Sequence, residues 1–442
     1  MIEPSTILAL LFAITCGLLA ANHSRRIGRV TLLDWSLLAM GGVYGLGWIL
    51  VLDATSQGLN PVWAGWILPF TELFIWHSIA SFLLLIGVVF GWTLYGPLQP
   101  LLRNYRRSEE TIRTNPRSWN FAFWILFALG SAAQVLYSQA YGGVIAQLEY
   151  SERVRSAVFE SLPDNPWSFL YPASGLVLIA ALGFFGLLLS GYWKVPSMLG
   201  ALLALPASFF VLFNAFGRLP FVTFVASLIL AVAVLRITSP IKLLLCASIA
   251  GATILVSAYW ISAWLEIKAS ESLIGFVSKE LSFPFGSFFA QMSKGEHLFR
   301  GFRDILVIPV FFLPTSLWSN WVDSVSQVNT ALIMGAPKGY SGVTAGIPVD
   351  LITLGIMQLH LPGIVVVGML FGALLRLTEG LLALIPYAGV RSAFEASLAL
   401  SLAVMSVFYA QPNLIVANHI HWLLGAAICF VVFVWHRKGV AR

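Results

Sequence analysis

The sequence predicts an all-α, polytopic integral membrane protein, and two observations support this fold class. Of its 442 residues, 59% are hydrophobic and only 10% are charged, whereas about a quarter of the residues in a soluble domain are charged. Apolar runs of membrane-spanning length also recur along the chain, each long enough for a helix that crosses about 30 Å of hydrocarbon. We therefore expect one integral membrane domain over residues 1–442.

Eleven apolar runs are predicted as transmembrane helices, within a range of ten to twelve because 380–390 fits a half-helix or a surface helix equally well. The predicted spans are 5–22, 31–52, 73–98, 119–140, 169–191, 196–215, 219–235, 243–264, 355–375, 394–410 and 419–436.

The distribution of Lys and Arg predicts the orientation, because positive residues concentrate on the cytoplasmic side of a membrane. One threading places sixteen of the 25 cations on one side, which leaves the long polar interval 266–344 on the other. The first residues, MIEPS, carry no cationic region typical of a cleaved signal, so we expect a retained first span with an outer N-terminus and an inner C-terminus. The net charge of +6 thus reflects topology, and we expect no nucleic-acid partner.

The interval 266–344 is predicted as a large outer loop that bears amphipathic helices. Within it, His297, Arg300, Arg303 and Asp304 fall on one arc of about 120° when drawn at helical spacing. This pattern predicts a helix on the membrane surface whose polar face presents two guanidinium groups, the natural partners of phosphate. A solvated face with an Arg300–Asp304 ion pair is an equally good interpretation.

Arg218 lies in a short connection between two apolar runs on the same outer side. An Arg at the end of a span is costly unless it is paired or reaches water. Two interpretations follow: the side chain reaches the lipid headgroups, or it faces the bundle and joins the loop arginines in binding a lipid-linked diphosphate.

Several other kinds of site have no signature in the chain. We find no Walker A loop, no GxGxxG after a strand, no HExxH and no Asp-x-Asp pair. The three cysteines lie far apart in separate apolar runs, which is no zinc pattern. We therefore expect neither a metal site nor a cofactor.

Three runs of the sequence resemble the Wzy-type O-antigen polymerases, which join oligosaccharide repeat units, and the last run also resembles the related O-antigen ligases. The runs are GRLPFVTFVASLIL, FFLPTSLW and VDLITLGIMQLHLPGIVVVGMLFGALLR, and together they cover roughly 210–376. The resemblance implies a glycosyltransferase of the bacterial inner membrane with a large periplasmic loop. Its implied partners are membrane lipids and an oligosaccharide linked to undecaprenyl diphosphate, with a chain-length regulator left open.

The chain departs from the family pattern at two places. Thr315 stands where such polymerases often carry an Arg, and His360 stands where a Gly is usual before Leu-Pro-Gly. Where the ligases carry a catalytic His, this chain has Val349 or Asp350. Asp350 is thus a candidate for the general base or for a sugar-binding carboxylate, or it caps a helix at the membrane interface.

The implied reaction is glycosyl transfer in the periplasmic leaflet with undecaprenyl diphosphate as the leaving group. We expect Arg218, Arg300 and Arg303 to bind the diphosphate without a metal, and Asp350 or His297 to act as the base. Trp318, Trp321 and Tyr340 are the expected sugar-binding residues.

Two other classes of function stay open at this point. A transporter or flippase of lipid-linked oligosaccharides needs charged groups along a path through the bundle. A metal-dependent glycosyltransferase needs acidic residues in an early outer loop, where Asp53 and Glu72 stand apart. An O-antigen ligase is the alternative nearest to the polymerase.

Overall fold

The computed structural model describes residues 4–56, 71–94, 115–150, 163–214, 218–264, 273–293, 299–313, 317, 322–340, 343 and 346–440. Within these ranges the chain forms helices joined by turns and short connections, and they contain no β-strand. The predicted all-α fold class is confirmed.

In the described part, nine helices are long and apolar enough to cross a membrane. They are Pro4–Ile27, Leu32–Asp53, Leu73–Leu94, Pro116–Tyr141, Ser168–Leu189, Val195–Phe213, Leu351–Leu382, Ala388–Phe408 and Pro412–Val432. Two shorter apolar stretches, Pro220–Arg236 and Pro240–Ile254, coincide with the two remaining predicted spans. The protein is a polytopic membrane protein, and a total of eleven spans stays a prediction.

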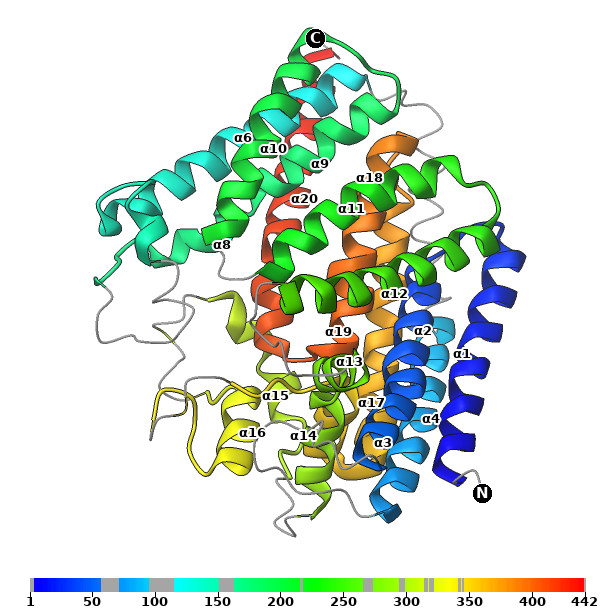
Figure 1. Cartoon of the computed structure of the whole chain (residues 1–442). Coiled ribbons are helices and arrows are strands. Elements are labelled where there is room, and N and C mark those ends of the chain that lie inside the picture. Colours follow the sequence, from blue (N-terminus) through cyan, green and yellow to red (C-terminus); the bar gives the residue numbers. More distant parts are fainter. Residues whose placement is uncertain are drawn as a thin grey trace.

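The helices form two groups that share α18 (Figure 1). The first group holds α1 (Pro4–Ile27), α2 (Leu32–Met40), the π-helix η1 (Gly41–Gly47), α3 (Trp48–Ser56), α4 (Thr71–Leu94) and α17 (Leu351–Leu382). The second holds α6 (Pro116–Ser138), α8 (Tyr171–Ser174), α9 (Leu176–Leu189), α10 (Val195–Asn214) and α20 (Pro412–Val440). Between them run α18 (Ala388–Leu398), the π-helix η8 (Ala399–Val404) and α19 (Met405–Phe408), while α11 (Arg218–Arg236) and α12 (Pro240–Trp264) slant across the others.

Glycine pairs bring α4 and α17 into backbone contact. A Cβ added at Gly372 would overlap Val88 O and approach Trp92 N to 2.9 Å, and one at Gly368 would lie 2.8 Å from Leu84 O. Gly91 on α4 meets the backbone of α17 in the same way. The helices of a membrane bundle gain stability from such close van der Waals packing. The Gly-x-x-x-Gly spacing of Gly368 and Gly372 in the sequence predicts a close helix contact. This prediction is confirmed, and the partner is the pair Gly87 and Gly91 on α4.

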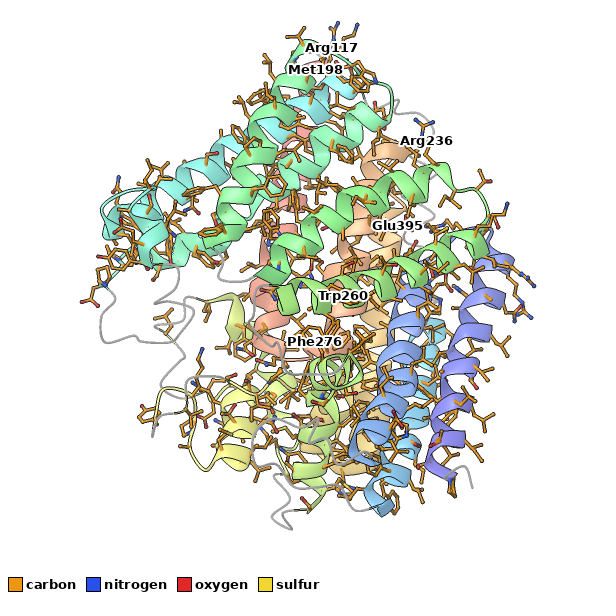
Figure 2. All side chains as sticks on the ribbon, viewed as in Figure 1. Arg117, Met198, Arg236, Trp260, Phe276 and Glu395 are labelled. Atoms are coloured by element: carbon orange, nitrogen blue, oxygen red, sulfur yellow. The ribbon has the colours of Figure 1, made fainter. Side chains whose placement is uncertain are left out.

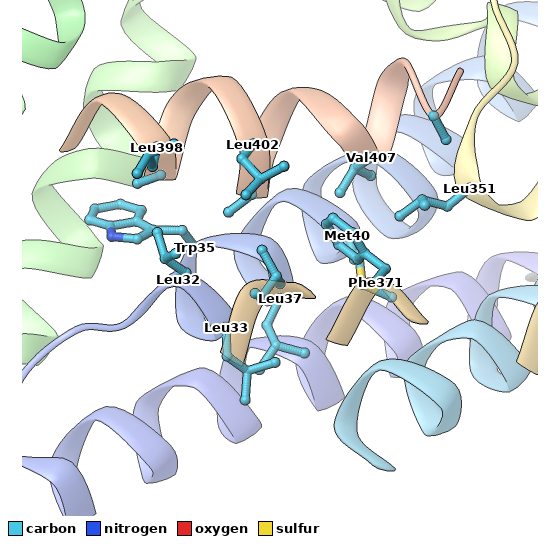
Figure 3. Packing of buried hydrophobic residues seen from close by; sticks show 14 of the residues in the cluster. Leu32, Leu33, Trp35, Leu37, Met40, Leu351, Phe371, Leu398, Leu402 and Val407 are labelled. Atoms are coloured by element: carbon cyan, nitrogen blue, oxygen red, sulfur yellow. The ribbon is translucent and has the colours of Figure 1, made fainter. Parts of the chain in front are cut away.

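The buried apolar side chains of α2 connect the two groups (Figure 3). Leu32 and Trp35 lie towards Leu398 of α18, and Met40 lies towards Val407 of α19. Trp35 is 4% exposed and Met40 is fully buried. This packing fixes α18 and α19 beside α2, and so positions the site described below.

The segment 273–340 does not lie loosely over the bundle, because one of its helices is inserted into it. All residues from Pro284 to Gln291 of α14 (Phe283–Ser293) are buried, and α14 contacts both α4 and α17. The neighbouring helices are α13 (Leu273–Leu281), α15 (Arg303–Leu306), the 3₁₀ helix η6 (Ile308–Phe312) and α16 (Val325–Met334). We call this end of the molecule, at the bottom of Figure 1, the loop end.

Two of the cations that the sequence threads to one side can be located in the structure. Arg117 and Arg236 both lie at the upper end in Figure 2, opposite the loop end where α1 begins. The arrangement agrees with the predicted threading, although which end faces the cytoplasm stays a prediction.

Candidate functional site

At the loop end, the helix α17 doubles back on itself. Leu359 and His360 leave the helical conformation, and His360 has a positive φ of 55°. A Cβ added at Gly355 would lie 2.5 Å from the Cα of Ile364, whereas a continuous helix would separate these residues by about 13 Å. The half-helix 351–358 therefore packs against the start of the long helix that follows it. We call residues 346–364 the re-entrant hairpin.

The chain enters this hairpin in an extended conformation, and side chains of the loop end satisfy its backbone. Thr330 Oγ1 accepts a hydrogen bond from Ile347 N at 2.7 Å. Ser326 Oγ donates to Ile347 O, and Ser287 Oγ donates to Pro348 O. Backbone groups inside a membrane bundle must find such partners because water is absent. Side chains of α14 and α16 at the loop end thus hold the hairpin in place.

Asp350 begins the half-helix and is fully buried. Its carboxyl oxygens accept hydrogen bonds from Ile352 N at 3.1 Å and Thr353 N at 3.2 Å, so the predicted helix cap is confirmed. Asp350 directly precedes the Leu351–Leu382 span, as predicted, but the turn at Leu359 and His360 folds the half-helix back into the bundle. Asp350 lies 2.8 Å from the hydroxyl of Tyr44, which stands near the middle of the Leu32–Asp53 span. The re-entrant hairpin carries the carboxyl group into the bundle.

Aromatic rings enclose a buried histidine beside this contact. The ring of His77 lies 5.7 Å from Tyr44, 5.6 Å from Trp48, 4.6 Å from Phe285 and 5.0 Å from Phe288, measured between ring centroids. Its Nε2 atom is buried without a hydrogen-bond partner. Nothing in the local sequence singles out His77, because its neighbours come from three separate elements.

The predicted surface helix over His297, Arg300, Arg303 and Asp304 is wrong in its geometry. Gly301 and Phe302 have positive φ angles of 54° and 62°, so the helix α15 begins only at Arg303. The stretch is instead anchored to the hairpin, because the backbone N–H groups of Arg300 and Gly301 donate to the carbonyls of Met357 and Gln358. These are carbonyls that the end of the half-helix leaves without helical partners.

Arg300 forms the ion pair that was one of the two interpretations of the sequence. Its Nε and Nη2 atoms donate to the carboxylate of Asp304 at 2.6 and 2.7 Å, and Gln358 Nε2 donates to the same carboxylate at 2.7 Å. Asp304 is 2% exposed. The ion pair fixes the position of the Arg300 guanidinium beside the end of the half-helix. Asp304 also neutralises much of the positive charge of this group.

The other predicted site residues divide into exposed and undescribed ones. Arg303 stands three residues after Arg300 and its side chain is exposed, as is that of Tyr340, which is 68% exposed. The side chain of Arg218 lies outside the described part of the structure, although its backbone begins α11. His297, Trp318 and Trp321 also lie outside the described residues. Arg300 and Arg303 thus lie on one loop beside the end of the half-helix. The roles expected for Arg218, His297, Trp318 and Trp321 stay predictions.

A second group of buried charges, which we call the Arg29 cluster, lies near the other end of α17. Arg29 pairs with Glu379 at 2.5 Å and with Glu395 at 3.6 Å, and His23 lies 2.9 Å from Asp34. The three carboxylates are at most 4% exposed. Burial disfavours the charge of Arg29, but the two glutamates outweigh it and raise the pKa of the guanidinium. The sequence predicts only a role in topology for Arg29, because Glu379 and Glu395 are hundreds of residues away in the chain.

The described residues contain no group of three or more His, Cys, Asp or Glu side chains that could hold a metal ion. No protein-family model, curated protein or solved structure matches the chain. The geometry of the hairpin and its anchored arginine loop is therefore the basis on which a function is argued.

Proposed function

We propose that the protein is a glycosyltransferase of the bacterial inner membrane that polymerises oligosaccharides linked to undecaprenyl diphosphate. The observation that carries the proposal is the loop of Arg300 to Arg303 at the mouth of the re-entrant hairpin. Its backbone is tied to Met357 and Gln358, and Asp304 holds the guanidinium of Arg300, so the loop that carries both arginines has a fixed position relative to the bundle. Fixed cations stabilise a charge that grows on a leaving diphosphate better than mobile ones.

In the proposed reaction, a hydroxyl group at the non-reducing end of one repeat unit attacks the anomeric carbon of the growing chain. A new C–O bond forms, the bond from the anomeric carbon to the diphosphate oxygen breaks, and the hydroxyl proton passes to solvent. Arg303 is the exposed cation for the departing diphosphate, and Arg218 is proposed as its second ligand. Arg300 keeps one guanidinium nitrogen, Nη1, outside its pair with Asp304.

The test is deletion of the gene in its host, followed by complementation and gel analysis of the surface polysaccharide. Arg303→Ala and Arg218→Ala should abolish the polymer ladder while the protein remains in the membrane. Lys194→Ala, a change of an exposed cation outside the loop end, should leave the ladder intact. A normal ladder in both arginine variants would refute the proposal. A deletion strain that keeps intact polymer on its lipid carrier would identify a ligase instead.

A transporter of lipid-linked oligosaccharides is the second candidate, and the buried carboxyl groups favour it. Asp350 lies inside the bundle and Glu379 lies in the same helix towards its other end. Helices broken near the middle of a membrane are typical of transporter binding sites. Vesicles that contain the purified protein distinguish the two functions: a transporter moves a labelled lipid-linked glycan between leaflets without lengthening it, and a polymerase lengthens it.

A further inference from the structure

The hydroxyl of Tyr44 makes two short contacts with oxygen atoms but carries only one proton to place between them. The Tyr44 hydroxyl oxygen lies 2.8 Å from Asp350 Oδ2 and also 2.8 Å from the carbonyl oxygen of Val407. Both distances are typical of O–H···O hydrogen bonds. A tyrosine hydroxyl carries a single proton, and a backbone carbonyl can only accept. One proton cannot occupy two such bonds, so a second proton is needed between these three oxygens.

Asp350 is the group that can supply the second proton. If its carboxyl is protonated, Oδ2–H donates to the Tyr44 oxygen while Tyr44 O–H donates to Val407 O, and both short contacts are satisfied. If it is ionised, one of the two contacts joins oxygen atoms with no hydrogen between them.

Among the residues that the structure describes, the surroundings of Asp350 offer no cation to hold it ionised. The segments 283–293, 351–358 and 405–408, which pack at this place, contain no Asp, Glu, Lys, Arg or His. From η1 the facing titratable group is Tyr44 itself, and from α4 it is His77, whose ring lies against the ring of Tyr44. An unpaired buried carboxylate is costly, and a buried acid commonly takes up a proton instead.

We propose that Asp350, Tyr44 and Val407 O form a proton-binding site inside the bundle, which holds one exchangeable proton and locks the re-entrant hairpin to η1 and α19. When the proton leaves for solvent, the single hydroxyl proton of Tyr44 must serve either the Asp350 carboxylate or Val407 O. One of the two connections is then lost. Proton occupancy therefore controls whether the half-helix, η1 and α19 are all connected through the hydroxyl of Tyr44. This inference does not depend on the proposed glycosyl transfer.

The test is infrared difference spectroscopy of the purified full-length protein in detergent at neutral pH, without substrate. Subtracting the spectrum of Asp350→Asn from that of the wild type should reveal the C=O band of a protonated carboxyl group. Asp304→Asn is the matched control, because Asp304 is equally buried but paired with Arg300. Its difference spectrum should show only the bands of an ionised carboxylate.

Loss of carboxylate bands alone in Asp350→Asn would overturn the proposal. Tyr44→Phe provides the second measurement if the first variant is not recovered in folded form. Removing the hydroxyl deprives Oδ2–H of its acceptor, so the carboxyl band should shift to higher frequency. A carboxyl band unchanged in Tyr44→Phe would equally refute the site. Neither outcome bears on polymer formation, so failure here and failure of the proposed function remain separate results.

Discussion

The two ends of α17 each carry a buried carboxyl group, and the protein accommodates them by different means. At the loop end, Asp350 contacts a hydroxyl and two backbone N–H groups and faces no charged residue. Near the other end, Glu379 is paired with the guanidinium of Arg29. The first arrangement depends on hydrogen bonds and a proton, whereas the second depends on opposite charge. Isosteric amide substitutions should therefore affect the two ends unequally.

The largest loss of folded protein is expected from a substitution that disturbs α17 itself, because this helix joins the two ends. Gly372→Ala places a Cβ against the backbone of α4 at Val88 and Trp92, and overpacking of this kind costs about 1–3 kcal/mol or more. We expect most of the folded protein to be lost, measured as the monodisperse fraction in size-exclusion chromatography. Gly17→Ala is the control, since no atom lies within 4 Å of its added Cβ. An equal yield of both variants would contradict the backbone contact.

The next effect distinguishes the two ends directly. Glu379→Gln leaves Arg29 without its closest carboxylate, and breaking a fully buried pair costs about 3–5 kcal/mol. Because the Arg29 side chain is 43% exposed, we expect a smaller loss of about 2 kcal/mol. Asp350→Asn keeps a donor for Tyr44 and should lower the melting temperature far less. Equal shifts in thermal unfolding would mean that both ends use charge.

A smaller loss is expected when the hydroxyl at the loop end is removed. Tyr44→Phe leaves Asp350 and Val407 O without this partner, and an unsatisfied buried polar group costs about 1–3 kcal/mol. The melting temperature should fall accordingly. Tyr340→Phe, at an exposed tyrosine, is the matched control and should have no measurable effect. The prediction fails if the two tyrosine variants unfold alike.

The smallest change in stability is expected for Arg303→Ala, and it distinguishes Arg303 from Arg300 on the same loop. Arg303 is exposed, so Arg303→Ala should leave the melting temperature nearly unchanged while it abolishes polymer formation. Arg300→Ala leaves Asp304 buried without its ion pair and should lower stability by about 1–3 kcal/mol. A variant of Arg303 that is as unstable as one of Arg300 would assign both residues to the same structural role.

Features that depend on local composition could be predicted from the sequence. The apolar runs identified the spans, the Gly368 and Gly372 spacing identified a close helix contact, and the four-residue spacing of Arg300 and Asp304 identified their ion pair. Each of these follows from residues near one another in the chain.

Features that depend on tertiary contacts could not be predicted in this way. The helix over Arg300 is broken because Gly301 and Phe302 adopt left-handed conformations that let the loop bond to Met357 and Gln358. Nothing in the local periodicity signals this anchor. In the same way, Asp350 is carried into the bundle by a turn at Leu359 and His360 within an otherwise helical pattern. Its partner Tyr44 is 306 residues away.

The extended entrance to the hairpin has a consequence for biogenesis. Ile347 and Pro348 hydrogen-bond to Thr330, Ser326 and Ser287, all of which are synthesised earlier. A translocon can release a continuous apolar helix into lipid, but it cannot release an extended segment whose backbone N–H and C=O groups have no hydrogen-bond partners. The hairpin must therefore enter the bundle after the segment that precedes it has folded. Shortening that segment should therefore arrest assembly of the whole protein.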